Sequence, residues 1–263
     1  MRPNRLRELV RSGAPVLNAW LAIPSAYSAE VMGHQGFDSV TVDLQHGMIG
    51  FDAAVPMLQA ISATPAVPLV RVSRNDYALV MQLLDAGAYG VICPMISTAE
   101  EARRFVSYCR YPPVGQRSYG PARGLLYGGA EYFRKANEEI LTLAMLETRE
   151  AVADADEIIA TPGLDGIYVG PNDLCLAYGK DPVPETDDIE VAGVIADLAR
   201  RSRAAGKIAG IFCSSGDGAR RRISDGFSMV TPGNDVGLLV RGSKEALAIS
   251  RNTTDAQDSK TGY

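Results

Sequence analysis

Short, almost wholly apolar runs alternate with amphipathic stretches along most of the chain. Within each short run, β-branched and other apolar residues occupy nearly every position rather than every second one. A strand that is apolar on both faces is typical of a parallel sheet covered on both sides. The pattern predicts eight strands, at residues 16–23, 39–44, 67–72, 90–95, 141–146, 166–169, 208–213 and 227–230.

Each predicted strand is followed by a stretch with helical spacing of its apolar residues. These predicted helices are residues 25–33, 51–63, 76–86, 98–108, 149–159, 189–205, 216–225 and 236–249. Thr98 and Glu101 have the spacing of a capping box, and Gly87 stands where a helix commonly ends in left-handed backbone. No G-x-G-x-x-G follows the first strand to favour a dinucleotide-binding open sheet. Eight strand–helix units therefore predict an α/β fold of the closed (β/α)8 TIM-barrel type.

The chain length agrees with one barrel. A (β/α)8 barrel typically takes about 250 residues, and the chain has 263. We expect one domain over residues 1–251. Residues 111–135, rich in Gly, Pro and Arg, are expected to form a long connection without regular structure, which is either functional or disordered. The polar residues 252–263 are expected to be a mobile tail.

Composition narrows the function classes. Lys and Arg total 26 against 31 Asp and Glu, a net charge of −5, so the basic stripe of a nucleic-acid binder is not expected. No apolar run approaches the ~20 residues of a membrane helix, and residues 1–13 lack the apolar region of a signal peptide. The four cysteines, at positions 93, 109, 175 and 213, form no C-x-x-C pair. Cys93 and Cys213 lie in apolar strand-like runs and are expected to be buried free thiols, which suggests a reducing, cytoplasmic setting.

Polar residues at the carboxyl ends of the predicted strands are the candidates for chemistry, because active sites of this fold lie there. Glu147 follows the fifth strand and Asp173 the sixth. Two such carboxylates could bind one hard divalent cation, or could simply accept backbone hydrogen bonds. His46 follows the second strand, where it either faces the barrel mouth or has a structural hydrogen bond. Arg71, inside an apolar strand, needs an anion, either Asp43 or a substrate oxyanion.

Histidine and lysine are scarce, with two and five residues respectively. His34, at a helix end, is expected to be structural. A Schiff-base aldolase needs a lysine in the barrel mouth, and no predicted strand contains one. Only Lys180, in the loop after the sixth strand, could reach the mouth.

From about residue 13 to residue 249, the chain resembles the metal-dependent class II pyruvate aldolases of the 4-hydroxy-2-oxoheptanedioate (hydroxy ketoacid) aldolase type. This resemblance implies a barrel of the phosphoenolpyruvate/pyruvate type. The matching motifs are NAWLAIPS (18–25), GFDSVTVDLQHG (36–47), VPLVRVSRND (67–76), LLDAGAYGVICPM (83–95), RYPPVGQRSYGPAR (110–123), LETREAV (146–152), GLDGIYVGPNDL (163–174) and GKIAGIF (206–212).

The resemblance also implies roles for individual residues. Glu147 and Asp173 would ligate Mg²⁺, Mn²⁺ or Co²⁺, and pyruvate would chelate the same ion. The backbone amides of Asn172 and Asp173 would hold the substrate carboxylate. Arg71 would stabilise the enolate, and His46 would act as the base.

Asp85 corresponds to the family's partner of that histidine. It closes a helix expected to end at the far rim of its own barrel, so it would reach His46 only in a neighbouring subunit. The alternative is an ordinary aspartate at a helix end. Family members form hexamers, and we expect a homo-oligomer that is a hexamer or is built from trimers.

Some positions depart from the family pattern. Gln45 stands where many relatives have Glu, and Met145 where a pyruvate-contacting Gln is common. Trp20 and Phe212 are expected to contact substrate, and Phe212 would narrow the aldehyde pocket. The loop from Arg117 to Arg123 either binds an acidic acceptor or is structural.

The expected function is reversible cleavage of a 4-hydroxy-2-oxo acid to pyruvate, or a related 2-oxo acid, and an aldehyde. One alternative is a related metal–enolate enzyme that decarboxylates oxaloacetate-like acids or forms carbon–carbon bonds. Another is a non-catalytic barrel that acts as a binding protein. Partners would be small 2-oxo acids and aldehydes, with neither nucleic acid nor membrane.

Overall fold

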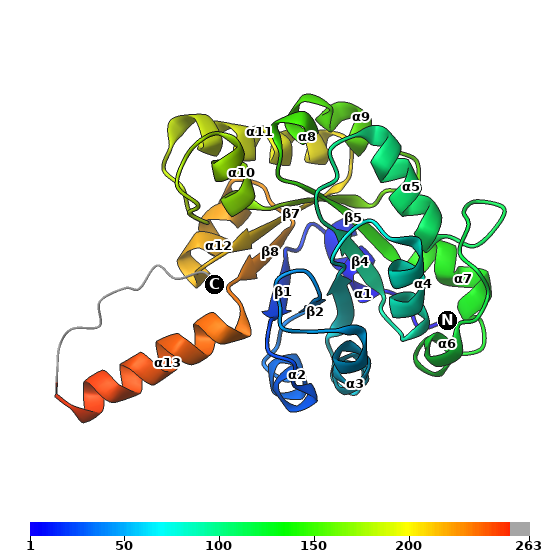
Figure 1. The fold of residues 1–263 in the computed structure, drawn as a ribbon, viewed down its shortest axis with the longest axis horizontal. Helices are drawn as coiled ribbons and strands as arrows, with labels where there is room; N and C mark the ends of the chain where they lie inside the picture. The colour runs from blue at the N-terminus through cyan, green and yellow to red at the C-terminus, as the bar shows by residue number, and fades with distance from the viewer. Residues whose placement is uncertain (253–263) are drawn as a thin grey trace.

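The computed structural model of the protein describes residues 1–252 as a closed barrel of eight parallel strands (Figure 1). The predicted TIM-barrel fold is therefore confirmed. The strands follow chain order around the barrel, and β1 closes the ring by pairing with β8. Their bounds are β1 (Val16–Leu21), β2 (Ser39–Asp43), β3 (Val67–Arg71), β4 (Gly90–Cys93), β5 (Leu141–Leu146), β6 (Gly166–Val169), β7 (Ile208–Cys213) and β8 (Met229–Pro232).

A polar layer fills part of the barrel interior. Asn18 donates a hydrogen bond to Thr231 Oγ1 at 2.8 Å and accepts bonds from Ser39 and Thr41 at 2.7 and 3.0 Å. Tyr168 lies 2.6 Å from the same Thr231 hydroxyl. Because side chains fill the interior, the barrel is a packed core rather than a pore.

Helices surround the barrel and account for most of the predicted amphipathic stretches. The capping box predicted at Thr98 and Glu101 is present. The helix bounds are α1 (Arg5–Arg11), α2 (Ala26–Gly33), α3 (Phe51–Ser62), α4 (Tyr77–Asp85), α5 (Ala99–Cys109), α6 (Ala122–Gly128), α7 (Tyr132–Glu139), α8 (Arg149–Ala153), α9 (Ala155–Ile159), α10 (Pro171–Ala177), α11 (Ile189–Ala204), α12 (Gly216–Ser224) and α13 (Asp235–Ser250).

The expectation that residues 111–135 lack regular structure is wrong. The second half of this segment forms α6 and begins α7. The fully buried Arg117 stacks on Tyr111 and Tyr132 and forms an ion pair with Asp85 at 2.7 Å. Arg123 donates to the carbonyl oxygen of Ala86 at 2.7 Å. These contacts give the segment a small core of its own. They support a structural role for Arg117 and Arg123, rather than binding of an acidic acceptor.

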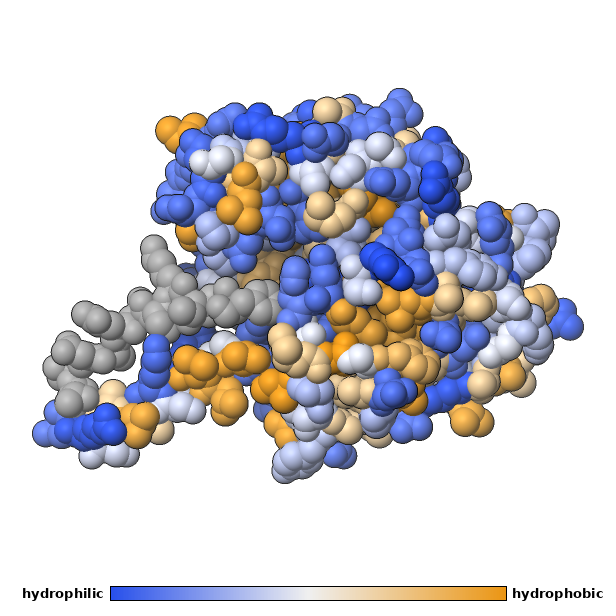
Figure 2. Space-filling model, viewed as in Figure 1, coloured by the Kyte–Doolittle hydropathy of each residue, from blue (hydrophilic) through white to orange (hydrophobic). Residues whose placement is uncertain are grey.

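Two further predictions are modified. The helix predicted over residues 149–159 divides into α8 and α9 at Asp154, whose carboxylate accepts a bond from the backbone N–H of Ala99 at 2.7 Å. The last predicted helix is present as α13, but it extends away from the barrel, and hydrophobic surface is exposed along it (Figures 1 and 2). The predicted tail lies outside the described residues apart from Asn252.

The prediction of buried free thiols at Cys93 and Cys213 is confirmed, and Cys109 and Cys175 are also buried and unbridged. Within residues 1–252, no helix combines the length and the apolar character needed to cross a membrane.

Candidate active site

A cavity of about 430 Å³ opens at the carboxyl ends of the strands. It contains every predicted site residue except Asp85, although these residues come from strands far apart in the sequence. Its lining is Trp20, His46, Met48, Arg71, Met145, Glu147, Gly170, Pro171, Asn172, Asp173 and Phe212.

Glu147 is the most deeply placed acid of the cavity. It follows β5, is 2% exposed, and accepts a hydrogen bond from the backbone N–H of Met95 at 2.9 Å. Burial raises the pKa of Glu147 to about 7, and the negative charge of Asp173 adds to this effect. The Met95 bond and the charge of Arg71 oppose it. Met95 itself adopts φ +56°, a left-handed conformation that costs energy for a side chain of its size.

The backbone at Gly170 makes room for this carboxylate. A Cβ atom built on Gly170 would overlap Glu147 Oε2. Only glycine therefore lets the end of β6 approach the acid so closely. Asp173 follows in the first turn of α10 and lines the same cavity.

The two carboxylates, Glu147 and Asp173, fit a hard divalent cation that would also be bound by water and substrate. No group of three His, Cys, Asp or Glu side chains within residues 1–252 is placed to hold an ion. Glu147 and Asp173 would thus supply two oxygen ligands and leave the remaining positions open, as catalytic metal sites require. The Oδ1 atom of Asn172 is buried without a hydrogen-bond partner among the described residues. An unpaired acceptor at this place is typical of a site that binds a cation or a donor group.

A single buried carboxylate organises the other side of the cavity. Asp43 is fully buried and accepts two bonds from Arg71, from Nε at 2.8 Å and Nη2 at 2.6 Å. It also accepts from Trp20 Nε1 at 3.1 Å and from the backbone N–H groups of Gln45 and His46 at 3.0 and 3.3 Å. Arg71 therefore has the structural partner that the sequence left open, and it still lines the cavity. Sequence reasoning missed that Asp43 also holds Trp20 and the turn of His46.

The remaining wall is apolar. Trp20 and Phe212 meet edge to face with ring centroids 5.7 Å apart, and the Arg71 guanidinium lies 4.8 Å from the Trp20 ring centroid. Met145 Sδ is 3.8 Å from Arg71 Nη1. Met48, 79% exposed, stands at the rim. The cavity thus has a charged half and a hydrophobic half.

Asp85 lies elsewhere. It ends α4, just before the amino end of β4, so it belongs to the opposite end of the barrel from the cavity. Burial raises the pKa of Asp85, and its ion pair with Arg117 opposes this shift. Lys180 pairs with Asp188 at 2.8 Å, and no lysine lines the cavity within the described chain. His34 is exposed at the end of α2.

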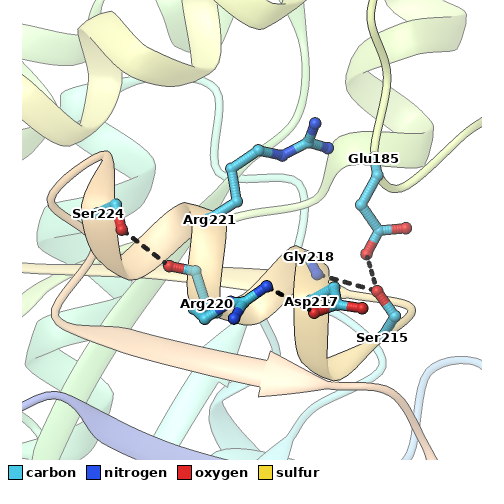
Figure 3. Close-up of a pocket in the computed structure, with 7 residues that line it drawn as sticks. All are labelled: Glu185, Ser215, Asp217, Gly218, Arg220, Arg221 and Ser224. Atoms are coloured by element: carbon cyan, nitrogen blue, oxygen red, sulfur yellow. Dashed lines mark hydrogen bonds and ion pairs between the residues drawn. The ribbon is translucent and has the colours of Figure 1, made fainter.

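A second cavity lies beside α12 (Figure 3). Glu185 accepts a bond from the backbone N–H of Ser214 at 2.7 Å, and Figure 3 shows its carboxylate directed at Ser215. Arg220 pairs with Asp217 at 2.9 Å. The Glu185 contacts join the loop after α10 to the start of α12, which is a structural role.

Comparisons with known proteins agree with this geometry. The model of the HpcH/HpaI aldolase/citrate lyase family matches residues 17–242. The chain belongs to this family. It is 42% identical over 248 residues to a hydroxypyruvate/pyruvate aldolase of Rhizorhabdus wittichii, covering 94% of this chain and 99% of the relative. It is 36% identical over 260 residues to a 4-hydroxy-2-oxo-heptane-1,7-dioate aldolase of Klebsiella pneumoniae, covering 97% of each.

A solved structure of the same family, from Burkholderia cenocepacia, superposes with a TM-score of 0.88 at 30% identity, covering 94% of this chain and 99% of that one. The protein is thus an aldolase, a carbon–carbon lyase. Enzymes of this family generally depend on a divalent metal.

Proposed function

We propose that the protein reversibly cleaves a 4-hydroxy-2-oxo acid to pyruvate, or a related 2-oxo acid, and an aldehyde. The main support is one cavity that contains two carboxylates, an arginine and a histidine, since these are the groups that enolate chemistry needs. The names of the two aldolase relatives point to the same class of substrate.

Glu147 and Asp173 are the proposed ligands of Mg²⁺, Mn²⁺ or Co²⁺. When bound, such an ion is a Lewis acid that takes up negative charge as the enolate forms. Burial makes the charged form of Glu147 costly, which is why its pKa is raised. A bound cation would stabilise that charged form in place of a proton, so this environment favours a cation.

Arg71 is the proposed stabiliser of the oxyanion. Its two bonds to Asp43 hold the guanidinium in one orientation before substrate arrives. A charge fixed in advance costs no reorganisation in the transition state. The backbone amides of Asn172 and Asp173, in the first turn of α10, are the proposed contacts of the substrate carboxylate.

His46 is the proposed base, because an imidazole exchanges protons readily near neutral pH. Asp43 fixes the turn that carries it. We propose further that Asp85 acts on His46 of a neighbouring copy, in a homo-oligomer that is a hexamer or is built from trimers. The support is that α4 carries Asp85 to the opposite end of its own barrel.

Trp20 and Phe212 are the proposed walls of the acceptor site, since they supply the apolar half of the cavity. Met145 replaces an amide with a thioether beside Arg71. We therefore expect binding of the 2-oxo acid to depend more on Arg71 and the metal than on side-chain hydrogen bonds at this position.

We also propose a cytoplasmic enzyme made of one domain, residues 1–251, with residues 252–263 as a tail. The four unbridged thiols support a reducing compartment. The proposed partners are small molecules, and the net charge of −5 gives no support for nucleic acid as a partner.

The test is pyruvate release from 4-hydroxy-2-oxo acids, coupled to lactate dehydrogenase, with and without EDTA and added Mg²⁺, Mn²⁺ or Co²⁺. We expect chelation to abolish release, metal to restore it, and Glu147→Ala to be inactive. Glu150→Ala, which changes an exposed acid on α8, is the matched control and keeps activity. Cleavage that resists EDTA would contradict the metal assignment. Release of pyruvate and CO₂ from oxaloacetate alone would favour the decarboxylase alternative.

A further inference from the structure

One carboxylate holds the loop between α10 and α11 against the end of β7. Glu185 of this loop accepts a hydrogen bond from the backbone N–H of Ser214 at 2.7 Å and another from the Ser214 hydroxyl. The hydroxyl of Ser215 donates a longer bond at 3.5 Å, and Figure 3 shows the carboxylate directed at this residue. Since β7 ends at Cys213, Glu185 supports the chain one residue beyond the end of the strand.

The start of α12 is shaped to receive this carboxylate. A Cβ atom built on Gly218, in the first turn of the helix, would overlap Glu185 Oε1. Ser215 caps the helix by accepting from the N–H of Gly218 at 2.9 Å. Glu185 therefore lies at the amino end of the helix, where the helix dipole favours an anion. A Cβ on Gly216, one turn position away, would meet open space.

The residue held by Glu185 is linked to both aromatic walls of the candidate active site. Ser214 follows Phe212 by two positions along the chain, and Phe212 lines the cavity. Ser214 also lies beside the turn after β8, because a Cβ built on Gly233 would be 3.4 Å from its carbonyl oxygen. The next residue of that turn, Asn234, forms a bridge with Trp20. The position of Ser214 therefore bears on both rings.

The same carboxylate is connected to the metal side of the cavity. Its loop, residues 178–188, follows α10, whose first turn carries Asp173. The two ends of the loop are joined by the ion pair between Lys180 and Asp188 at 2.8 Å. Glu185 thus ties the helix that carries a proposed metal ligand to the strand that carries part of the apolar wall.

We propose that Glu185 is a positioning residue for the aldehyde side of the cavity. Through Ser214, its carboxylate fixes the end of β7 and so holds the Phe212 ring against Trp20. A ring that is already fixed does not have to be ordered when the aldehyde binds, and this lowers the cost of binding. The consequence for catalysis rests on the proposed function, whereas the effect on the two rings does not.

The fluorescence of Trp20 measures this effect without any reaction, because Trp20 is the only tryptophan of the chain. Its side chain is buried, at 1% exposure. We expect Glu185→Ala to raise the quenching of this fluorescence by acrylamide about twofold or more, since a loosened Phe212 admits the quencher. The matched control, Asp187→Asn, changes an exposed acid of the same loop and leaves the quenching unchanged. Native quenching in Glu185→Ala would overturn the proposal.

A second variant displaces the same carboxylate without altering it. In Gly218→Ala the new Cβ pushes Glu185 away from Ser214, so we expect the same rise in quenching. Gly216→Ala, on the same helix but facing open space, is the matched control and behaves like the unmodified chain. Circular dichroism shows whether each barrel is intact. A folded Gly218→Ala chain with native quenching would also overturn the proposal.

Kinetics of aldol addition test the consequence for the substrate, with pyruvate, propanal and Mg²⁺ as the probes. We expect Glu185→Ala to raise the KM for propanal about fivefold or more, with the KM for pyruvate and kcat within about twofold of native. An equal rise in both KM values, or a fall in kcat alone, would overturn the positioning role. A native chain that adds no propanal to pyruvate would count against the proposed function instead, and the quenching result decides separately whether Glu185 holds Phe212.

Discussion

Two buried carboxylates at strand ends, Asp43 and Glu147, show how surroundings give similar acidic side chains different roles. Asp43 is surrounded by donors from Arg71, Trp20 and two backbone amides. Glu147 accepts one hydrogen bond from a backbone N–H, that of Met95, while burial and the negative charge of Asp173 raise its pKa. Glu147 could be predicted as a site residue because it follows an apolar strand, whereas the sequence offered Asp43 only as one possible partner of Arg71. The sequence could not predict which of the two acids is paired, because the partners come from other strands.

Removing the charge of Asp43 should destabilise the fold. Asp43→Asn leaves the Arg71 guanidinium buried without its counter-charge, and breaking a buried ion pair in this way costs about 3–5 kcal/mol. Urea unfolding measures the change in the free energy of unfolding. Asp217→Asn is the control, because its pair with Arg220 is exposed and surface pairs contribute about 0–1 kcal/mol. Equal effects of the two substitutions would contradict a structural role for the Asp43–Arg71 pair.

The raised pKa of Glu147 predicts how stability depends on pH in the metal-free protein. Its pKa is about 7 in the folded state against 4.5 ordinarily, so the folded chain binds a proton that the unfolded chain releases. This stabilising contribution is complete below pH 4.5 and is lost as pH rises through 7, and between pH 5 and pH 8 the change is about 2–3 kcal/mol. Urea unfolding in EDTA at pH 5 and pH 8 measures it.

Glu147→Gln should remove this part of the pH dependence, and Glu150→Gln, on an exposed acid, should keep it. If Glu147→Gln loses as much stability between pH 5 and pH 8 as the unmodified chain, another group is responsible.

At the scale of elements, the sequence pattern predicted the eight strands because nearly every strand residue is buried, on both faces of the sheet. It did not predict α6 or the start of α7, since Gly, Pro and Arg in residues 111–135 argue locally against helix. Their core comes from Arg117 between Tyr111 and Tyr132, which are distant contacts that a local pattern does not contain. Periodicity also predicted α13, but helical spacing does not reveal that the helix extends away from the barrel.

The junction between β6 and α10 should tolerate no side chain. In Gly170→Ala the new Cβ would displace the Glu147 carboxylate. We expect at least a tenfold loss of Mn²⁺ affinity, since neighbours that orient metal ligands are worth about 10–100-fold. Isothermal titration calorimetry measures the affinity, and circular dichroism shows whether the barrel is intact. Gly193→Ala in α11, where a Cβ meets open space, should leave affinity unchanged. Native affinity in Gly170→Ala would show that Glu147 does not hold the ion.

At the scale of the whole molecule, the barrel explains why one cavity contains every predicted site residue except Asp85. Closing eight parallel strands brings their carboxyl ends together, so residues from Trp20 to Phe212 meet in one cavity. Asp85 precedes the amino end of β4, and its described partner is Arg117. Within one chain Asp85 therefore serves the Arg117 ion pair, and a role in catalysis requires a site in another copy.

Mixed oligomers would separate these roles of Asp85. His46→Ala and Asp85→Asn should each be inactive alone if both residues serve catalysis. If Asp85 acts on a neighbouring copy, a mixed pair contains one site in which both residues are altered and one in which both are native. Random mixing of two chains in dimers then restores up to about a quarter of the native activity, measured as pyruvate release after co-expression. Thermal unfolding of each variant serves as the control for folding. If Asp85 acts only within its own chain, no site in the mixture has both native residues, and no activity returns. An Asp85→Asn enzyme that is active on its own would show that Asp85 serves only its ion pair with Arg117.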